Sequence, residues 1–166
     1  GQDGRSGGLH NGKEPSVLAM QYPYEFAREA DYASTLDNQI VPELKATGRV
    51  AMLESFDGKS LYTVCYPQEN ARGTVLIVHG FTENVDKYSE VIHAFLFNGY
   101  AVIAYDQRGH GRSWRDPKIA DKSITYVDHF EDYVGDLETV CEKLLRSMPQ
   151  PWYLFSHSMG GAVAAL

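Results

Sequence analysis

The sequence predicts an α/β fold with a mostly parallel sheet, and two kinds of segment carry that prediction. Three short apolar runs, 74–78, 100–105 and 152–155, are typical of strands that are buried on both faces of a sheet. They alternate with two stretches of helical periodicity, 85–96 and 127–145. Strands and helices that alternate in this way form parallel sheets with right-handed crossovers, and the helices cover both faces.

An antiparallel hairpin is predicted at the N-terminal edge of this sheet. Residues 49–56 and 61–66 have the composition of strands, and Asp57-Gly58 lies between them. An Asp-Gly pair between two strand-like runs is the strongest short hairpin pattern, because both residues tolerate the backbone conformation of a tight turn.

Both helical stretches have residues suited to their ends. Asn84 suits the N-terminal cap of the first helix, and Gly99 suits its end. In the second helix, Asp128 and Glu131 are spaced as a capping box, and Pro149 lies just past the end.

The last strand leads into a serine-centred turn. The run Ser156-His157-Ser158-Met159-Gly160 is followed by small residues, Gly161 to Ala165, which predict the start of a helix. A serine on a sharp turn between a strand and a helix is typical of a nucleophile elbow, in which small residues flank the nucleophile. We therefore interpret Ser158 as the nucleophile, supported sterically by Ser156, His157, Gly160 and Gly161.

An activated serine also needs donors for the oxyanion that its attack creates. The N–H of Met159 follows the nucleophile, at the start of the predicted helix, and is the first predicted donor. The second is expected in the loop after the strand at 74–78, which begins His79-Gly80-Phe81. We expect Gly80 to let the backbone approach closely, and the N–H of Phe81 to be the donor.

The other polar residues near these loops are interpreted as structural. His79 and His110 are expected to be hydrogen-bonded structural histidines, and the side chain of His157 is expected to point away from the nucleophile. Asp106 is interpreted as a loop brace and Asp136 as part of a solvated helix face, because both precede the nucleophile in the sequence.

Composition excludes several classes of partner. The 166 residues carry a formal net charge of −7, and no Lys/Arg stripe is present, which argues against nucleic acid and against strong attachment to an anionic membrane. No apolar run reaches the roughly 18 residues of a membrane span, so peripheral membrane contact is the most we expect. No metal-ligand spacing occurs, and neither a metal nor another cofactor is predicted. Cys65 and Cys141 lie in apolar segments as expected for buried free thiols, which favours the cytoplasm.

Several of these motifs together resemble a known family. His79-Gly80-Phe81, the loop 106–113, the helix opening 128–137 and the run 156–161 resemble the α/β-hydrolases, and more narrowly the monoacylglycerol lipase and bacterial lysophospholipase branch. The resemblance implies that the strand before His79 neighbours the strand before Ser158. It also implies Ser158 as nucleophile, the N–H groups of Phe81 and Met159 as oxyanion donors, and a cap segment that selects the acyl group.

Three parts of the chain follow from this interpretation. Residues 1–13 are expected to be a disordered tail or a remnant of expression, and residues 14–47 an N-terminal helical extension. Residues 48–166 are expected to be the N-terminal part of an α/β-hydrolase domain that ends just after the elbow, with the triad acid, the catalytic histidine and the cap beyond Leu166.

The predicted function is that of a serine ester hydrolase acting on a small-molecule substrate, a monoacyl lipid or other ester, through an acyl-enzyme on Ser158. Two alternatives stay open. One is a peptidase of proline-iminopeptidase type or an acyltransferase with the same elbow. The other is a catalytically dead binding module that keeps the hydrolase shell. The oligomeric state is not predicted.

Overall fold

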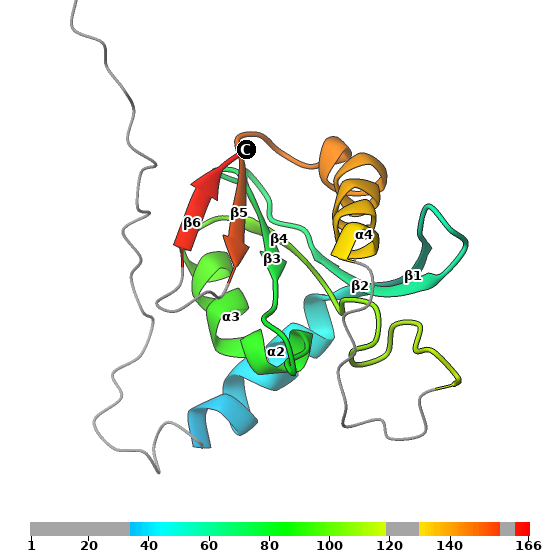
Figure 1. Ribbon diagram of the computed structural model, residues 1–166. Helices are drawn as coiled ribbons and strands as arrows, with labels where there is room; N and C mark the ends of the chain where they lie inside the picture. Colours follow the sequence, from blue (N-terminus) through cyan, green and yellow to red (C-terminus); the bar gives the residue numbers. More distant parts are fainter. Residues whose placement is uncertain (1–33, 119–129, 157–161) are drawn as a thin grey trace, which may run out of the picture.

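The computed structural model describes residues 34–118, 130–156 and 162–166, within which six strands form one sheet in the order β1-β2-β4-β3-β5-β6 (Figure 1). The strands are β1 (Arg49–Glu54), β2 (Ser60–Tyr66), β3 (Thr74–Val78), β4 (Ala101–Tyr105), β5 (Trp152–Ser156) and β6 (Ala162–Ala165). Strand β3 pairs in parallel with both β4 and β5 and so forms the centre of the sheet. The predicted α/β architecture is confirmed.

The predicted N-terminal hairpin is confirmed. Strands β1 and β2 pair antiparallel, and Gly58 in the connecting turn has a φ of 83°, which a residue with a side chain rarely adopts. Strand β2 pairs antiparallel with β4. The hairpin therefore adds two strands to one side of the parallel centre.

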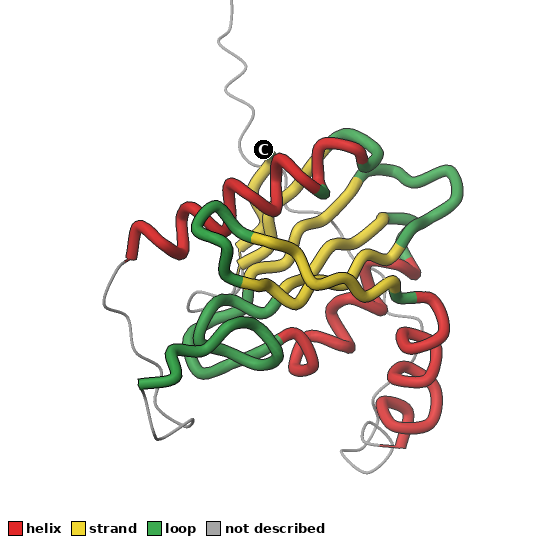
Figure 2. Tube along the Cα trace, turned by 90° about the vertical axis from the view of Figure 1, so that its right-hand side faces the viewer, coloured by secondary structure: helices red, strands yellow, loops and turns green. Residues whose placement is uncertain are grey.

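Helices cover both faces of the sheet, as Figures 1 and 2 show from two directions. The helical segments are η1 (Leu36–Ile40), α2 (Val41–Thr47), η2 (Val85–Tyr88), α3 (Ser89–Phe97), α4 (Phe130–Lys143) and η3 (Leu145–Ser147). Of these, α2 and α3 lie on one face and α4 lies on the other (Figure 1). As expected, the Asn84 side chain caps the first predicted helix, since it accepts a hydrogen bond from Asp86 N–H. The capping residue predicted for α4, Asp128, lies outside the described residues.

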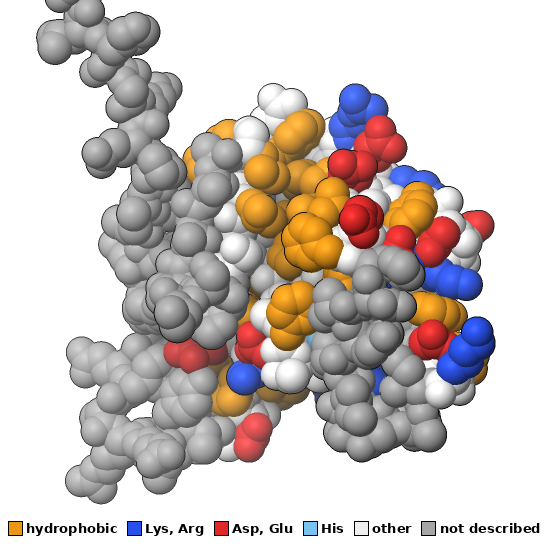
Figure 3. Space-filling model, in the orientation of Figure 1, with side chains coloured by type: hydrophobic (Ala, Val, Ile, Leu, Met, Phe, Trp, Pro, Cys, Tyr) orange, Lys and Arg blue, Asp and Glu red, His pale blue; other side chains and the backbone are white. Residues whose placement is uncertain are grey.

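Alternate residues of the central strands face two separate layers of core. On β3, Val75 and Ile77 pack toward α3, whereas Leu76 packs toward α4. All five residues of β4 are buried, because helices cover both of its faces. Beside α4, partly buried hydrophobic side chains of β5 reach the surface, and in Figure 3 such side chains gather between β5 and α4.

The segment after the serine run is a strand, and the prediction of a helix there is wrong. Residues Ala162–Ala165 form β6, which pairs antiparallel with β5 from Tyr153↔Ala165 to Ser156↔Ala162. The physical reason is the edge of β5, whose backbone N–H and C=O groups would otherwise lack partners on the side away from β3. For a segment of four residues, the backbone hydrogen bonds to β5 stabilise a strand more than a single helical turn would be stabilised by its own bonds.

The helices of the described residues are short. The longest, α4, has 14 residues and carries five acidic side chains in its sequence FEDYVGDLETVCEK. None of the helices in the described ranges is long and apolar enough to cross a membrane.

Candidate active site

The carboxyl ends of the three parallel strands meet at one edge of the sheet. In the register of the sheet, Val78 at the end of β3 lies opposite Tyr105 of β4 and Ser156 of β5. The loops that follow these residues therefore leave the sheet side by side, at the edge where ligands bind in parallel α/β sheets. The expectation that the strand before His79 neighbours the strand before Ser158 is confirmed.

Most of the predicted elbow lies outside the described residues. Ser156 is the last residue of β5 and pairs with Val78 on one side and Ala162 on the other. The residues of the elbow that the structure does not describe are His157, Ser158, Met159, Gly160 and Gly161. The assignments of the nucleophile and of the first backbone donor therefore stay predictions.

The loop after β3 begins with a tight turn from Gly80 to Glu83. The N–H of Glu83 donates to the carbonyl of Gly80 (N···O 3.2 Å), and Thr82 inside the turn has a φ of 66°. A β-branched residue rarely adopts this left-handed conformation, so contacts around the turn must hold it there. One such contact is the hydrogen bond from Thr82 N–H to Nε2 of His110 (3.3 Å).

Glu83 and Tyr88 hold the start of the same turn. The N–H of Gly80 lies 3.1 Å from Oε1 of Glu83 and 3.3 Å from the hydroxyl of Tyr88, to which it can also donate. Burial, the largest influence, raises the pKa of Tyr88 to about 12, so its hydroxyl keeps its proton and donates to Oε1 of Glu83 (3.2 Å).

Phe81 lies between Gly80 and Thr82, whose backbone N–H groups are both held by hydrogen bonds. The amides before and after it, those of Gly80 and Thr82, donate to side chains of this site, whereas no acceptor for the Phe81 N–H occurs among the residues that the structure describes. Its side chain is 51% exposed, and its ring meets the ring of Tyr133 edge-on with the centroids 5.9 Å apart. The amide predicted as the second oxyanion donor thus has its hydrogen-bonding capacity left for another group.

His79, the first residue after β3, is buried and bonded through both ring nitrogens. Its Nε2 accepts a hydrogen bond from the N–H of Gln107 (2.8 Å), and its Nδ1 lies 2.7 Å from the carbonyl oxygen of Gly80. A ring nitrogen that accepts from an amide carries no proton. The ring is therefore neutral, its proton is on Nδ1, and Nδ1 donates to Gly80.

His110, in the loop after β4, is bonded in the same way, with one ring nitrogen bonded to the other loop and one to its own loop. Its Nε2 accepts from Thr82 N–H, and its Nδ1 lies 2.9 Å from the carbonyl oxygen of Arg108. The rings of His79 and His110 lie 4.9 Å apart, so the two loops brace each other through this pair of imidazoles. All four ring nitrogens are bonded to backbone groups, as expected for hydrogen-bonded histidines that brace their loops.

Stability is expected to fall in mild acid because of His79. Burial, above all, and the neighbouring His110 lower the pKa of His79, against the opposing effects of the Gly80 carbonyl, Asp106 and Glu83. The unfolded chain binds this proton at the ordinary histidine value of about 6.5, so between that value and the lower folded pKa the unfolded state holds more protons. The free energy of unfolding should therefore rise with pH through this window, and the contribution should be complete above it.

Denaturant unfolding at about pH 5 and about pH 7.5 measures this effect, and the variant His79→Asn should show a smaller difference between the two conditions. An equal pH dependence in the variant and the unsubstituted protein would contradict the assignment to His79.

Asp106 is a loop brace, as predicted. Its side chain is fully buried, with Oδ1 accepting from Val85 N–H (2.7 Å) and Oδ2 from Arg112 N–H (2.9 Å). The Ser113 hydroxyl donates to its backbone carbonyl. At Gly111, which has a φ of 50°, an added Cβ would lie 2.1 Å from Oδ2 of Asp106, so a glycine is required for the loop to close around this carboxylate.

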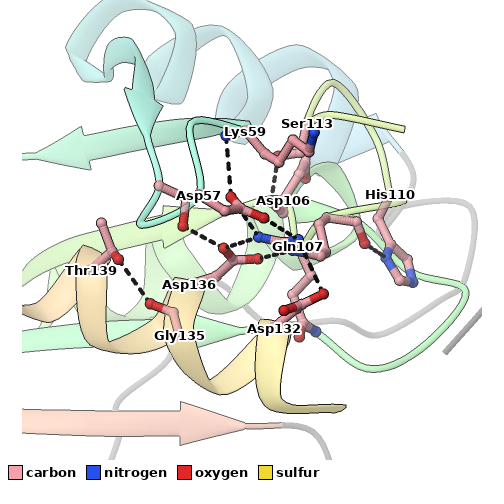
Figure 4. Close-up of polar contacts among 12 residues, drawn as sticks. Asp57, Lys59, Asp106, Gln107, His110, Ser113, Asp132, Gly135, Asp136 and Thr139 are labelled. Atoms are coloured by element: carbon pink, nitrogen blue, oxygen red, sulfur yellow. Dashed lines mark hydrogen bonds and ion pairs between the residues drawn. The ribbon is translucent and has the colours of Figure 1, made fainter. Parts of the chain in front are cut away.

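Arg108 joins the loop after β4 to α4 and to the hairpin turn, and Figure 4 labels the aspartates that it binds, Asp57, Asp132 and Asp136. Its guanidinium binds both carboxylate oxygens of Asp136 on α4 (2.7 and 2.7 Å) and both oxygens of Asp57 in the hairpin turn (2.9 and 3.2 Å). A weaker ion pair reaches Asp132 (3.5 Å). Burial opposes ionisation of Asp57, but the hydrogen bonds and charge of Arg108 prevail and lower its pKa. The same carboxylates, Asp136 first, raise the pKa of Arg108.

The interpretation of Asp136 as a solvated helix face is wrong. Its side chain is 1% exposed, and besides Arg108 it accepts a hydrogen bond from the Ser55 hydroxyl. The helical spacing contained the necessary pattern, because Tyr133, Asp136 and Val140 lie on one face of α4 and all three are buried. A carboxylate on a buried face needs a cationic partner, and Arg108 supplies it.

Reasoning from the sequence gave no role in this site to two residues, Glu83 and Gln107. Gln107 bonds His79 twice, because its N–H donates to the ring and its side-chain amide donates to the backbone carbonyl (2.6 Å). Glu83 lies close to His79-Gly80 in the sequence, and Gln107 directly follows Asp106. The sequence therefore indicated the right loops but not the roles of these side chains. Within the described ranges, no group of three or more His, Cys, Asp or Glu side chains is arranged to hold a metal ion.

Comparison with known proteins gives the family. Residues 69–166, more than half of the chain, match the family described as serine aminopeptidase, S33. Lysophospholipase L2 of Escherichia coli K12 is 38% identical over 95 residues, which are 55% of this chain and 27% of that protein. Monoglyceride lipase of Saccharomyces cerevisiae is 31% identical over 130 residues, 74% of this chain and 37% of that protein.

A solved structure of the yeast enzyme, a soluble variant in complex with a substrate analog, superposes with a TM-score of 0.51 at 31% identity. The superposition covers 68% of this chain and 34% of that one. The chain thus spans about a third of the length of the relatives that it matches. Fold and family match together show that it belongs to the serine aminopeptidase S33 family of the α/β-hydrolases, in the branch of the monoacylglycerol lipases and lysophospholipases.

Proposed function

We propose that the protein containing this chain is a serine ester hydrolase that cleaves monoacyl lipids, with Ser158 as the nucleophile. The observation that carries the proposal is the register Val78↔Ser156. It supports a site in which the loop with the Phe81 N–H and the run that contains Ser158 leave neighbouring strand ends.

The chemistry follows from these positions. The hydroxyl of Ser158 attacks the ester carbonyl while a histidine base takes its proton, and the N–H groups of Phe81 and Met159 stabilise the oxyanion of the tetrahedral intermediate. Collapse of the intermediate breaks the ester C–O bond, and the protonated base returns its proton to the departing alcohol. Water then hydrolyses the acyl-enzyme by the same sequence, releasing the fatty acid and free Ser158.

The base and its acid are proposed to follow residue 166, in the order nucleophile, acid, histidine. The bonds of His79 and His110 support this placement, because all their ring nitrogens are already held by backbone groups.

A monoacyl lipid is the substrate class that the relatives' names support, since they are a lysophospholipase and a monoglyceride lipase. Exposed apolar side chains beside the site support it too. Phe130 (64% exposed) and Val134 (38% exposed) lie one turn apart on α4, and the intervening Tyr133 contacts the half-exposed ring of Phe81. These groups offer an acyl chain an apolar surface next to the proposed oxyanion donor.

We also propose a cytoplasmic setting with at most peripheral membrane contact. Cys65 and Cys141 are both free, partly buried thiols, and burial raises the pKa of each. Unpaired cysteines of this kind are usual in a reducing compartment.

Labelling with a fluorophosphonate tests the nucleophile. The protein expressed from its complete coding sequence should form one covalent adduct, and peptide mass spectrometry should locate that adduct on Ser158. An adduct on another serine, or no adduct at all, would contradict the proposal, and the second result would favour a hydrolase shell without catalysis.

The family description names a second activity that can be tested, that of an aminopeptidase. Parallel assays with lysophospholipid, monoacylglycerol and aminoacyl anilides separate the two. We expect cleavage of the monoacyl lipids, with turnover of the anilides lower by at least about 100-fold, because an ester-cleaving site needs no pocket for a free amino group. Faster turnover of the anilides would establish the peptidase instead.

A further inference from the structure

The N–H of Phe81 and the carbonyl of Gly80 belong to the same peptide group. Such a group is planar and trans, so its N–H points opposite to its C=O. The Gly80 oxygen accepts two hydrogen bonds, from Nδ1 of His79 (2.7 Å) and from the N–H of Glu83 (3.2 Å). Whatever fixes the direction of this oxygen also fixes the direction of the Phe81 N–H.

The ring of His79 is itself held in one orientation. Gln107 binds it from the neighbouring loop, with its N–H on Nε2 (2.8 Å) and its side-chain amide on the His79 carbonyl (2.6 Å). The side chain is 3% exposed, and the ring of His110 lies against it. The bond from Gln107 also decides the tautomer, because it leaves Nδ1 as the nitrogen that carries the proton.

We propose that His79 is a positioning residue for the reaction, whose Nδ1–H aims the Gly80–Phe81 peptide so that the Phe81 N–H faces the carbonyl oxygen that Ser158 attacks. This inference rests on the proposed function. A hydrogen bond to a peptide oxygen also polarises the N–H of the same peptide, which makes it a better donor. A donor held in place before the reaction stabilises the transition state without reorganisation.

Two substitutions at His79 separate positioning from a purely structural role. In His79→Asn, the side-chain amide can place an N–H where Nδ1 stands and keep the bond to Gly80, but it loses the acceptor for Gln107. In His79→Gln, the amide oxygen can stand where Nε2 does and keep the bond from Gln107, but it loses the donor to Gly80. Each variant gives up one buried hydrogen bond, so similar losses of stability are expected from both.

The catalytic effects should differ. For ester hydrolysis by the complete protein, kcat of His79→Gln should fall by about 10- to 100-fold with KM within about twofold, because a misaimed donor weakens only the transition state. His79→Asn should keep a kcat about tenfold above that of His79→Gln. A matched control is His93→Asn on α3, which loses a hydrogen bond to Glu43 away from this edge of the sheet and should leave kcat unchanged.

Equal kcat values in the two His79 variants would overturn the inference and leave the proposed function intact. Absence of the Ser158 adduct in the unsubstituted protein would overturn both. A measurement independent of folding of the variants is ¹⁵N NMR of the unsubstituted protein, which reports the tautomer of each imidazole. A protonated Nδ1 on His79 is expected, and a proton on Nε2 instead would refute the proposal.

Discussion

Replacing Ser158 with alanine is expected to abolish ester hydrolysis by the complete protein, with kcat lower by roughly 10⁴-fold or more. Loss of the nucleophile leaves only the oxyanion donors and substrate binding to assist the attack of water, which is why some activity above the uncatalysed rate should remain. The measurement is the initial rate with a p-nitrophenyl ester and with a lysophospholipid, together with fluorophosphonate labelling, which should disappear.

Ser147→Ala provides the matched control. Ser147 is an exposed serine after α4 whose hydroxyl donates to the Leu144 carbonyl (3.0 Å), so its removal should change neither rate nor labelling. If Ser158→Ala kept a rate within tenfold of the unsubstituted protein, Ser158 would not be the nucleophile.

Replacing Arg108 with methionine is expected to destabilise the protein by about 3–5 kcal/mol, because it leaves the carboxylate of Asp136 buried without a cation. Asp136 is 1% exposed and, among the residues that the structure describes, would keep only the Ser55 hydroxyl as a partner. The same change removes the two hydrogen bonds that tie Asp57 in the hairpin turn to the loop after β4. Urea unfolding measures the loss in free energy of unfolding, provided that the slope of this free energy against urea concentration is equal in the two proteins.

A second arginine of the same loop is the control. Arg112 pairs with Asp86, but the side chains are 53% and 64% exposed, so Arg112→Met should cost about 1 kcal/mol or less. The double variant Arg108→Met with Asp136→Leu should recover most of the loss, since apolar residues of similar size can replace a buried ion pair. A small effect of Arg108→Met, matching that of Arg112→Met, would show that the buried pair is not important for stability.

The sheet could be predicted from the sequence because the residue types of its central strands reflect their burial. Strand β4 is buried along its whole length and contains only apolar residues and tyrosine, and the turn between β1 and β2 depends on the local pair Asp57-Gly58. The helix predicted after the serine run failed although alanine favours a helix, because the segment Ala162–Ala165 pairs with the open edge of β5 instead. Local preference determines the secondary structure of a segment only where tertiary contacts are absent, and here the neighbouring strand β5 supplies such contacts.

The site could be predicted only in part. Its loops followed from the ends of the strands, but the tautomer of His79 depends on Gln107, which arrives from another loop. Likewise the environment of Asp136 depends on Arg108, which lies well before it in the sequence. Contacts between loops distant in the chain leave no periodic pattern, so reasoning from local sequence assigns each residue to its commonest environment.

The order of the strands also governs when the catalytic edge can assemble during synthesis. Strand β3 meets β4 after one short helical crossover, whereas its other neighbour, β5, emerges from the ribosome only after α4 and η3. Pairings between nearby segments form faster than those that close long loops. The half of the edge with His79, Phe81 and His110 can therefore form first, before β5 and the proposed nucleophile that follows it have been synthesised.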